Sequence, residues 1–166
     1  VAEAHSRNMA VILDWVANHT SWDHPWIDST GWYTTDAQGN IIHPSGTNWT
    51  DVADLNFDNT ALQEQMIDAM RYWVLEANVD GYRCDAADYV PFDFWQKAID
   101  SLRIIPNREI IMLAEGARVD HFDAGFDMNF DWSFYNKGKD IFNQGTPASH
   151  WAVSYTHLTL PTTKQV

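Results

Sequence analysis

Short apolar runs recur along the chain, and each is too short to form a helix. Residues 10–13 are continuously apolar and predict a buried strand that ends at Asp14. Residues 81–85 predict a second strand, and residues 109–115 predict the clearest one. Residues 126–130 alternate apolar and polar side chains, which is typical of a fourth strand.

Two segments between these runs have the spacing of amphipathic helices. The first begins at Thr60, because Thr60-Ala61-Leu62-Gln63 fits a capping box, and it ends before residues 78–80. The second covers residues 92–102, and residues 2–9 contain the end of a further helix. The apolar side chains of the first helix fall on one face: Leu62, Met66, Ala69, Met70, Trp73 and Val74.

A long segment without periodicity separates the first strand from the first helix. It runs from Thr20 to Asp58 and is rich in Trp, Asp, Asn, Gly, Pro and Thr. Loops of this length are usually functional. The aromatic side chains in it suit either core packing or the C–H faces of sugars: Trp22, Trp26, Trp32, Tyr33 and Trp49. Strands that alternate with helices on either side of it predict an α/β fold with parallel strands.

Composition narrows the class of partner. Acidic residues outnumber basic ones 23 to 10, for a formal net charge of -13. This balance argues against a nucleic-acid partner, because such proteins carry a basic face. No apolar run approaches the roughly 18 residues needed to span a bilayer, so we expect no membrane span. Cys84 is the only cysteine, so an internal disulfide is excluded and the compartment stays undecided.

Three acids follow or end the apolar strands: Asp14, Asp85 and Glu115. The carboxyl ends of parallel strands meet at one edge of a sheet, where barrel enzymes hold their active sites. Two carboxyls that face one pocket are the equipment of glycoside hydrolysis. Strand-end acids also commonly cap helices or pair with basic side chains, so position alone leaves both interpretations open.

The residues around these acids carry a family resemblance. Asp14-Trp15-Val16-Ala17-Asn18-His19 resembles the first short motif of the α-amylase family of glycoside hydrolases, and Gly81-Tyr82-Arg83-Cys84-Asp85-Ala86 resembles its second. Glu115 at the end of an apolar strand resembles the third, and Asp54-Leu55-Asn56 resembles an accessory motif. The motifs stand in the family's order. The resemblance covers about residues 10–135.

The resemblance implies roles for individual residues. Asp85 would be the nucleophile and Glu115 the general acid/base of a retaining reaction on α-glucosidic bonds of starch-like glucans, oligosaccharides or α-glucosides. His19 would donate a hydrogen bond to the sugar, and Asp14 would be a buried organiser of the loop. Arg83 lies two residues before Asp85 on the same strand and so points to the same side, where it can hold the carboxylate ionised.

A metal is implied only through one residue. Asn18 matches a position that binds calcium in many members of the family. Calcium takes several oxygen ligands, and the sequence does not identify the others. His24 and His43 show no tight metal-binding spacing with His19, so a catalytic transition metal is not expected.

The resemblance also implies the architecture. Residues 1–152 would form a partial (β/α)8 TIM barrel with about strands three to six, and residues 20–58 would be a small irregular domain inserted after strand three. We expect residues 153–166 to be a non-native or disordered tail. The family's fourth motif, an apolar strand leading to His-Asp, is not found, so the third catalytic Asp lies outside this chain. We therefore expect the chain alone to be inactive.

Two other functions remain open from the sequence. One is a non-catalytic relative that uses an amylase-like fold for binding or assembly. The other is a different barrel hydrolase with two acids that acts on β-linked sugars. The presence of Arg83, Asp85, Glu115 and His19 together favours the catalytic interpretation over the first, and the order of the motifs favours it over the second.

Overall fold

The computed structural model describes residues 1–149. The chain divides into two compact units, Val1–Phe130 and Asp131–Val166. The expectation for residues 153–166 lies outside the described residues. Within the described part, no helix is long and apolar enough to cross a membrane.

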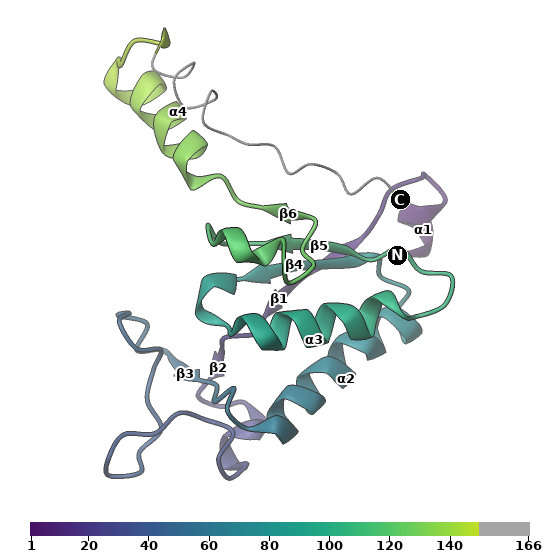
Figure 1. Cartoon of the computed structure of the whole chain (residues 1–166), viewed down its shortest axis with the longest axis vertical. Helices are drawn as coiled ribbons and strands as arrows, with labels where there is room; N and C mark the ends of the chain where they lie inside the picture. The colour runs from purple at the N-terminus through teal and green to yellow at the C-terminus, as the bar shows by residue number, and fades with distance from the viewer. Residues whose placement is uncertain (150–166) are drawn as a thin grey trace. The chain divides into compact units, whose positions relative to one another are not determined.

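A four-stranded parallel sheet forms the centre of the first unit (Figure 1). Its strands are β1 (Ile12–Val16), β4 (Gly81–Asp85), β5 (Ile111–Ala114) and β6 (Met128–Asn129), in the order β1-β4-β5-β6. The predicted parallel order is confirmed. Parallel pairing places the carboxyl ends of all four strands at the same edge.

The first strand extends further than its apolar run. Asp14 is the central residue of β1 and pairs with Arg83 of β4, so the prediction that the strand ends at Asp14 was wrong. Polar residues continue a strand when the side chains alternate between a covered face and an open one. Here Leu13 and Trp15 pack against the core, whereas Ile12, Asp14 and Val16 are exposed.

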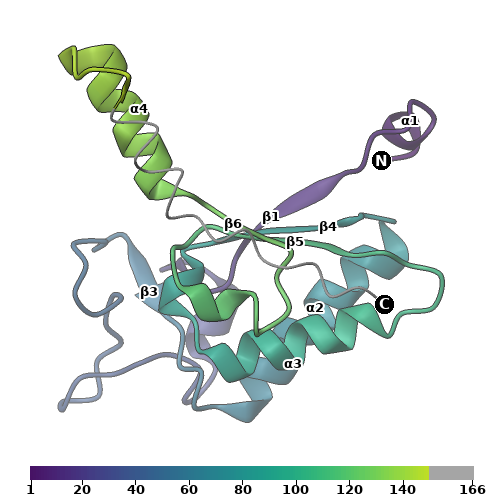
Figure 2. The same cartoon turned by 45° about the horizontal axis from the view of Figure 1, so that its top comes forward.

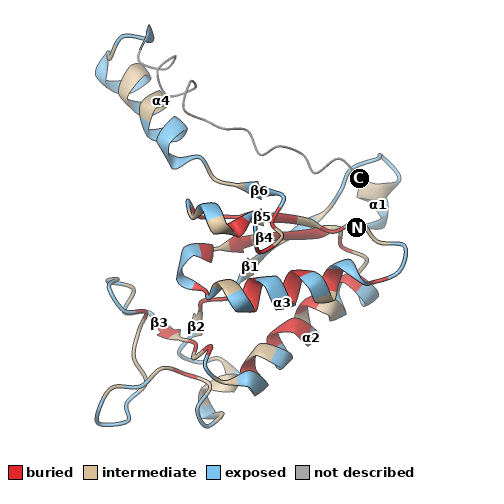
Figure 3. Ribbon diagram, viewed as in Figure 1, coloured by how far each residue is buried: buried red, intermediate tan, exposed pale blue. Residues whose placement is uncertain are grey.

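Two helices cover one face of the sheet, α2 (Thr60–Glu76) and α3 (Phe92–Arg103) (Figure 2). The covered face carries side chains that are fully buried: Tyr82 and Cys84 of β4, Met112 and Ala114 of β5. Figure 3 shows this burial along the strands and on the helix sides that face them. Arg83 and Asp85 alternate with the buried residues and so point to the other face, which these helices leave uncovered.

The buried face of α2 differs slightly from the predicted one. Its buried side chains are Leu62, Met66, Ile67, Met70 and Val74. Trp73 is 42% exposed and Ala69 is only half-buried, so the apolar face given by helical spacing is buried only in part. The Tyr82 hydroxyl of β4 donates a hydrogen bond to the Met70 carbonyl, which fixes the helix on the sheet.

The amino end of α2 is capped by Asn59. The Asn59 Oδ1 accepts hydrogen bonds from the backbone N–H groups of Ala61 and Leu62, at 3.0 and 3.2 Å. Gln63 instead donates its side-chain amide to the Phe57 carbonyl. The capping box assigned to Thr60 and Gln63 was therefore wrong. Asn and Thr are both good N-cap residues, so the sequence did not separate two neighbouring candidates.

A small antiparallel pair organises the long segment after β1. It consists of β2 (His19–Ser21) and β3 (Val52–Asp54). Leu55 donates its backbone N–H to the Asn18 carbonyl, and Asn56 donates to the Trp32 carbonyl. The accessory motif at residues 54–56 thus ties the inserted segment to the end of β1. A short 3-10 helix, η1 (Pro25–Asp28), lies within the segment.

The remaining elements are short or lie in the second unit. The first unit begins with α1 (Ala2–His5) and contains two further 3-10 turns, η2 (Ala87–Tyr89) and η3 (Val119–His121). The described part of the second unit contains α4 (Trp132–Gln144), which was not predicted. Asp131 caps its amino end, and it ends at Gly145 in the left-handed conformation.

The cap of α2 yields the first prediction. Asn59→Ala should lower the free energy of unfolding by about 1 kcal/mol, because two N–H groups lose their acceptor. Thr60→Ala, which removes no cap contact, should cost clearly less. Urea unfolding of both variants measures the difference. A larger loss of unfolding free energy for Thr60→Ala would instead support the capping box of Thr60 and Gln63.

Candidate active site

Arg83 gathers three carboxylates at the carboxyl edge of the sheet. Its Nη1 donates to Asp14 Oδ1 and to Asp85 Oδ1, each at 2.7 Å. Its Nη2 lies 2.7 Å from Glu115 Oε2. The three acids come from β1, β4 and the residue after β5, so the parallel register brings them together. The structure thus places Asp14, Arg83, Asp85 and Glu115 in one cluster.

The guanidinium is stabilised in its charged form. Partial burial acts to lower the pKa of Arg83, but hydrogen bonds to Asp14 and Asp85 and the charge of Glu115 outweigh it, and the pKa is raised. The Phe130 ring lies 5.6 Å from the guanidinium carbon. Arg83 is therefore a permanent positive charge between the acids.

Two expectations for this cluster need correction. The Asp14 side chain is 66% exposed, so the prediction that it is buried was wrong. It lies on the face that α2 and α3 leave uncovered, on the end strand of the four-stranded sheet. Arg83 also contacts Glu115 as closely as Asp85, so the guanidinium does not by itself distinguish the two carboxyls.

The backbone after β4 contacts Glu115 directly. Ala86 donates its N–H to Glu115 Oε2 at 3.1 Å, and Ala87 donates to the Glu115 carbonyl at 3.0 Å. Ala86 adopts a left-handed conformation with φ of 46°. Such backbone costs an alanine about 1–3 kcal/mol and is concentrated at functional sites. Here it turns the Ala86 N–H toward Glu115 immediately after Asp85.

His19 stands beside the cluster at the start of β2. Burial lowers the pKa of His19, while the charges of Asp85, Asp51 and Asp54 partly oppose this. Asn18 Nδ2 lies 3.4 Å from His19 Nδ1, a contact in which the amide donates, so the proton of the neutral ring is assigned to Nε2. The imidazole is then a neutral hydrogen-bond donor at neutral pH.

The aromatic side chains of the inserted segment fall into two groups. Trp26 and Trp32 pack against each other with ring centroids 5.1 Å apart, and Tyr33 is buried, so these three serve the core. Trp49 instead lies 5.6 Å from the His19 ring and 5.2 Å from Tyr89. Tyr89 is 50% exposed. The rings of His19, Trp49 and Tyr89 therefore extend away from the acid cluster.

Two further candidate residues near this edge, Asn18 and Cys84, are buried. Asn18 is buried, and no three His, Cys, Asp or Glu residues converge as a metal-binding group within residues 1–149. Cys84 is fully buried on the helix-covered face, and burial raises the pKa of its thiol. Cys84 is therefore a buried core residue, and its protonated thiol is unreactive.

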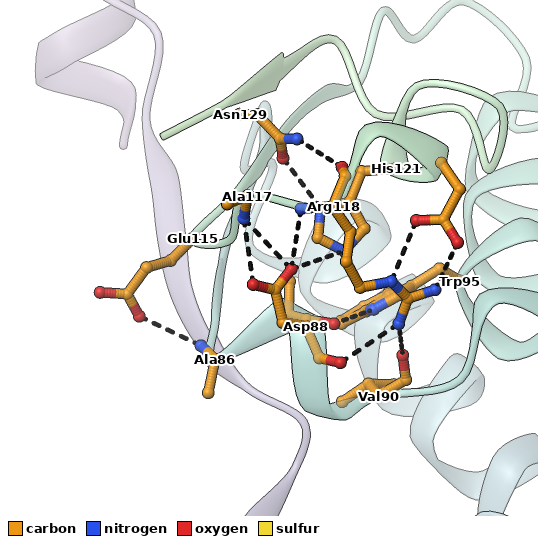
Figure 4. A network of polar contacts seen from close by, with 11 residues as sticks. Ala86, Asp88, Val90, Trp95, Glu115, Ala117, Arg118, His121 and Asn129 are labelled. Atoms are coloured by element: carbon orange, nitrogen blue, oxygen red, sulfur yellow. Dashed lines mark hydrogen bonds and ion pairs between the residues drawn. The ribbon is translucent and has the colours of Figure 1, made fainter. Parts of the chain in front are cut away.

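A polar network in the loops that follow Asp85 and Glu115 was not predicted from the sequence. It joins η2 to the loop after β5, and Figure 4 shows Arg118, His121 and Asn129 around Asp88. Its members are Asp88, Arg118, Asp120, His121 and Asn129. None belongs to a recognisable motif, and Asp88 and Arg118 are separated by 30 positions. Only the tertiary structure reveals that they belong together.

The fold and the acid cluster define a class. Parallel β–α units whose strand ends present converging carboxyls are the construction of a (β/α)8-barrel enzyme, here with four of the strands within residues 1–149. Among solved structures, the maltogenic α-amylase AmyB from Thermotoga neapolitana matches with a TM-score of 0.83 and 33% identity. That match covers 93% of this chain and 36% of the other. The chain is thus part of such a barrel.

Comparison with protein sequences identifies the family. The model of the alpha amylase catalytic domain matches residues 47–126. The α-amylase MalA of Haloarcula japonica is 29% identical over an alignment of 145 residues that covers 81% of this chain and 21% of that relative. A cyclomaltodextrin glucanotransferase of Niallia circulans is 34% identical over an alignment of 122 residues that covers 59% of this chain and 17% of that relative. In sequence and in structure the chain is similar to members of the α-amylase family.

The lowered pKa of His19 yields a prediction. In an NMR titration the imidazole should titrate below its ordinary value of 6.5. Asp85→Asn should lower the midpoint further, because the Asp85 charge raises it. The folded chain disfavours the charged ring, so His19 contributes stability above about pH 6.5 that is lost as pH falls through the lowered pKa. An unchanged midpoint in Asp85→Asn would contradict the influence of the Asp85 charge on the pKa of His19.

Proposed function

We propose that the protein containing this chain is a retaining glycoside hydrolase that acts on α-glucosidic bonds through a covalent glycosyl-enzyme intermediate. One observation carries the proposal. Arg83 contacts both Asp85 and Glu115 at 2.7 Å, so the two carboxyls face the same space at the carboxyl edge of the strands. A retaining reaction needs two such carboxyls in close proximity.

The two acids take different roles. Asp85 attacks the anomeric carbon as a carboxylate, while Glu115 protonates the leaving glycosidic oxygen. Glu115 then removes a proton from water, which attacks the same carbon and releases Asp85. The Ala86 N–H and Arg83 both fix the Glu115 carboxyl, so its orientation is set before substrate binds.

A neutral sugar suits the surroundings of the acids. His19, with its proton on Nε2, donates to a sugar hydroxyl, and the rings of Trp49 and Tyr89 offer apolar surface to the C–H faces of further sugar units. The net charge of -13 does not oppose a substrate without charge. Relatives that bear the names of an α-amylase and of a glucanotransferase leave water or a second sugar as the acceptor.

Calcium keeps a secondary place in the proposal. Asn18 is the candidate ligand, through its side-chain oxygen, and calcium bound there would order the start of the inserted segment rather than react. No step of the mechanism depends on it. We also propose that this chain alone has little activity, because it spans 36% of the Thermotoga neapolitana enzyme and the third acid of the family lies in none of its motifs.

A chimera tests the proposal without depending on the chain alone. Residues 1–149 replace the matching part of the Thermotoga neapolitana α-amylase, which supplies the other barrel strands. The chimera should cleave maltooligosaccharides, and a fluorinated α-glucosyl fluoride should form an adduct on Asp85 that mass spectrometry detects. Glu115→Gln should lower kcat by about 100- to 10,000-fold.

The controls for the chimera are Asp85→Asn, which should form no adduct, and circular dichroism, which should show a folded protein in every variant. A folded chimera that is inert on α-glucans and on small α-glucosides would contradict the substrate class. An adduct on a residue other than Asp85 would contradict the assignment of the nucleophile.

The aromatic rings of Trp49 and Tyr89 beside His19 give a separate prediction. In the active chimera, Trp49→Ala should raise KM on the order of tenfold, equivalent to about 1.4 kcal/mol of lost contact, and should change kcat much less. Trp22→Ala is a matched control on the same inserted segment, because the Trp22 side chain is exposed and donates its indole N–H to the Thr50 carbonyl. Equal effects of both substitutions would point to loss of folding of the segment.

A further inference from the structure

Asp88 joins the two loops that carry the catalytic pair. It lies in η2, three residues after Asp85, and its carboxylate accepts the N–H of Ala117 at 3.0 Å and the N–H of Arg118 at 3.2 Å. Ala117 and Arg118 belong to the loop after β5, two and three residues beyond Glu115. Asp88 therefore anchors the chain just after Glu115.

Arg118 returns contacts in the opposite direction. Its Nη1 donates to the carbonyls of Asp88 and Val90, both at 3.2 Å. Asp120 holds the same guanidinium through Nε at 3.0 Å and Nη2 at 2.7 Å. The two loops are thus joined from both sides, by an acid of the first and a base of the second.

His121 closes the network from the interior. The ring is fully buried, and its Nδ1 lies 2.9 Å from Asn129 Oδ1, while Asn129 Nδ2 donates to the Arg118 carbonyl. Since Asn129 presents its oxygen, the ring donates from Nδ1. His121 Nε2 lies 3.6 Å from Asp88 Oδ1, so the ring packs beside the carboxylate. Figure 4 shows Asp88 between this ring and the backbone of Ala117 and Arg118.

Asp88 and His121 pack closely against Gly116, the residue that follows Glu115. A Cβ on Gly116 would lie 2.4 Å from Asp88 Oδ1 and 2.6 Å from His121 Cε1, so no side chain fits there. Glu115 itself is bonded to Ala86 and Ala87 on the Asp88 side, through its carboxyl and its carbonyl. A displacement of the loop after β5 would therefore move the Glu115 carboxyl away from the Ala86 N–H.

We propose that Asp88 is a positioning residue for Glu115, which holds the loop after β5 so that the Glu115 carboxyl stays on the Ala86 N–H and opposite Asp85. The role needs a carboxylate. Asp88 faces the backbone N–H groups of Ala117 and Arg118, and an ionised acid offers acceptors only. An asparagine would turn an NH2 group toward one of these donors. The catalytic meaning rests on the proposed function, but the positioning does not.

The first test uses this chain and measures the rate of hydrogen exchange at individual backbone amides. In Asp88→Asn, NMR should show faster exchange at Ala117 and Arg118, and also about tenfold or more faster exchange at Ala86, with a shifted Glu115 carboxyl resonance. The η2 turn should persist, because the buried Trp95 still donates its indole N–H to the Ala87 carbonyl. Asp123→Asn makes the same change of charge on the loop after β5 and should leave Ala86 and Glu115 as in the wild type.

A second variant keeps the test decisive if Asp88→Asn does not fold. Gly116→Ala leaves Asp88 intact but forces a methyl group against its carboxylate, and it should likewise speed exchange at Ala86. Faster exchange at Ala117 and Arg118, with Ala86 and Glu115 unchanged in the folded variants, would overturn the proposal. Asp88 would then anchor its own loop and nothing more.

The chimera supplies the functional readout. There Asp88→Asn should lower kcat by about 10- to 100-fold with KM within about twofold, because a misplaced acid weakens the transition state more than substrate binding. A loss of thermal stability with kcat unchanged would overturn the proposal. An inert wild-type chimera would contradict the proposed function instead, and the exchange at Ala86 would still decide the role of Asp88.

Discussion

Arg83 places one fixed positive charge among Asp14, Asp85 and Glu115, at 2.7 Å from each. Three carboxylates at the end of one sheet would repel one another, and the guanidinium offsets that repulsion with donors aimed at all three. The arrangement depends on register. Asp14 pairs with Arg83 across β1 and β4, and Glu115 follows β5 directly, so a shift of one residue would turn these side chains to the helix-covered face.

The sheet sets which acids meet, and the loops beyond it set how they are held. Arg83 contacts Asp85 and Glu115 alike, so different roles for the two must arise from other neighbours. Glu115 accepts the Ala86 N–H and lies next to the Asp88 network. Asp85 instead lies close enough to His19 for its charge to raise the pKa of that ring, against the lowering by burial. The left-handed Ala86 links both environments, because its strained backbone directly follows one acid and donates to the other.

Much of this could be predicted from sequence because local patterns determine it. The apolar strand at residues 109–115, the helical spacing after Thr60 and the strand-end acids all predicted elements that the structure contains. Neighbouring alternatives failed: Asn59 rather than Thr60 caps α2, and Asp14 lies exposed within its strand. The Asp88 network was beyond reach, since Asp88, His121 and Asn129 meet only through tertiary folding and match no spacing rule.

The central claim is that β4 and β5 present Asp85 and Glu115 as one catalytic pair. A crystal structure of the chain, or of the chimera with a bound maltooligosaccharide, measures the separation of their carboxyl groups most directly. A retaining pair should lie about 5–5.5 Å apart with Arg83 in contact with both. A separation of about 6.5–9.5 Å would indicate inversion, and carboxyls on opposite faces of the sheet would contradict the account altogether.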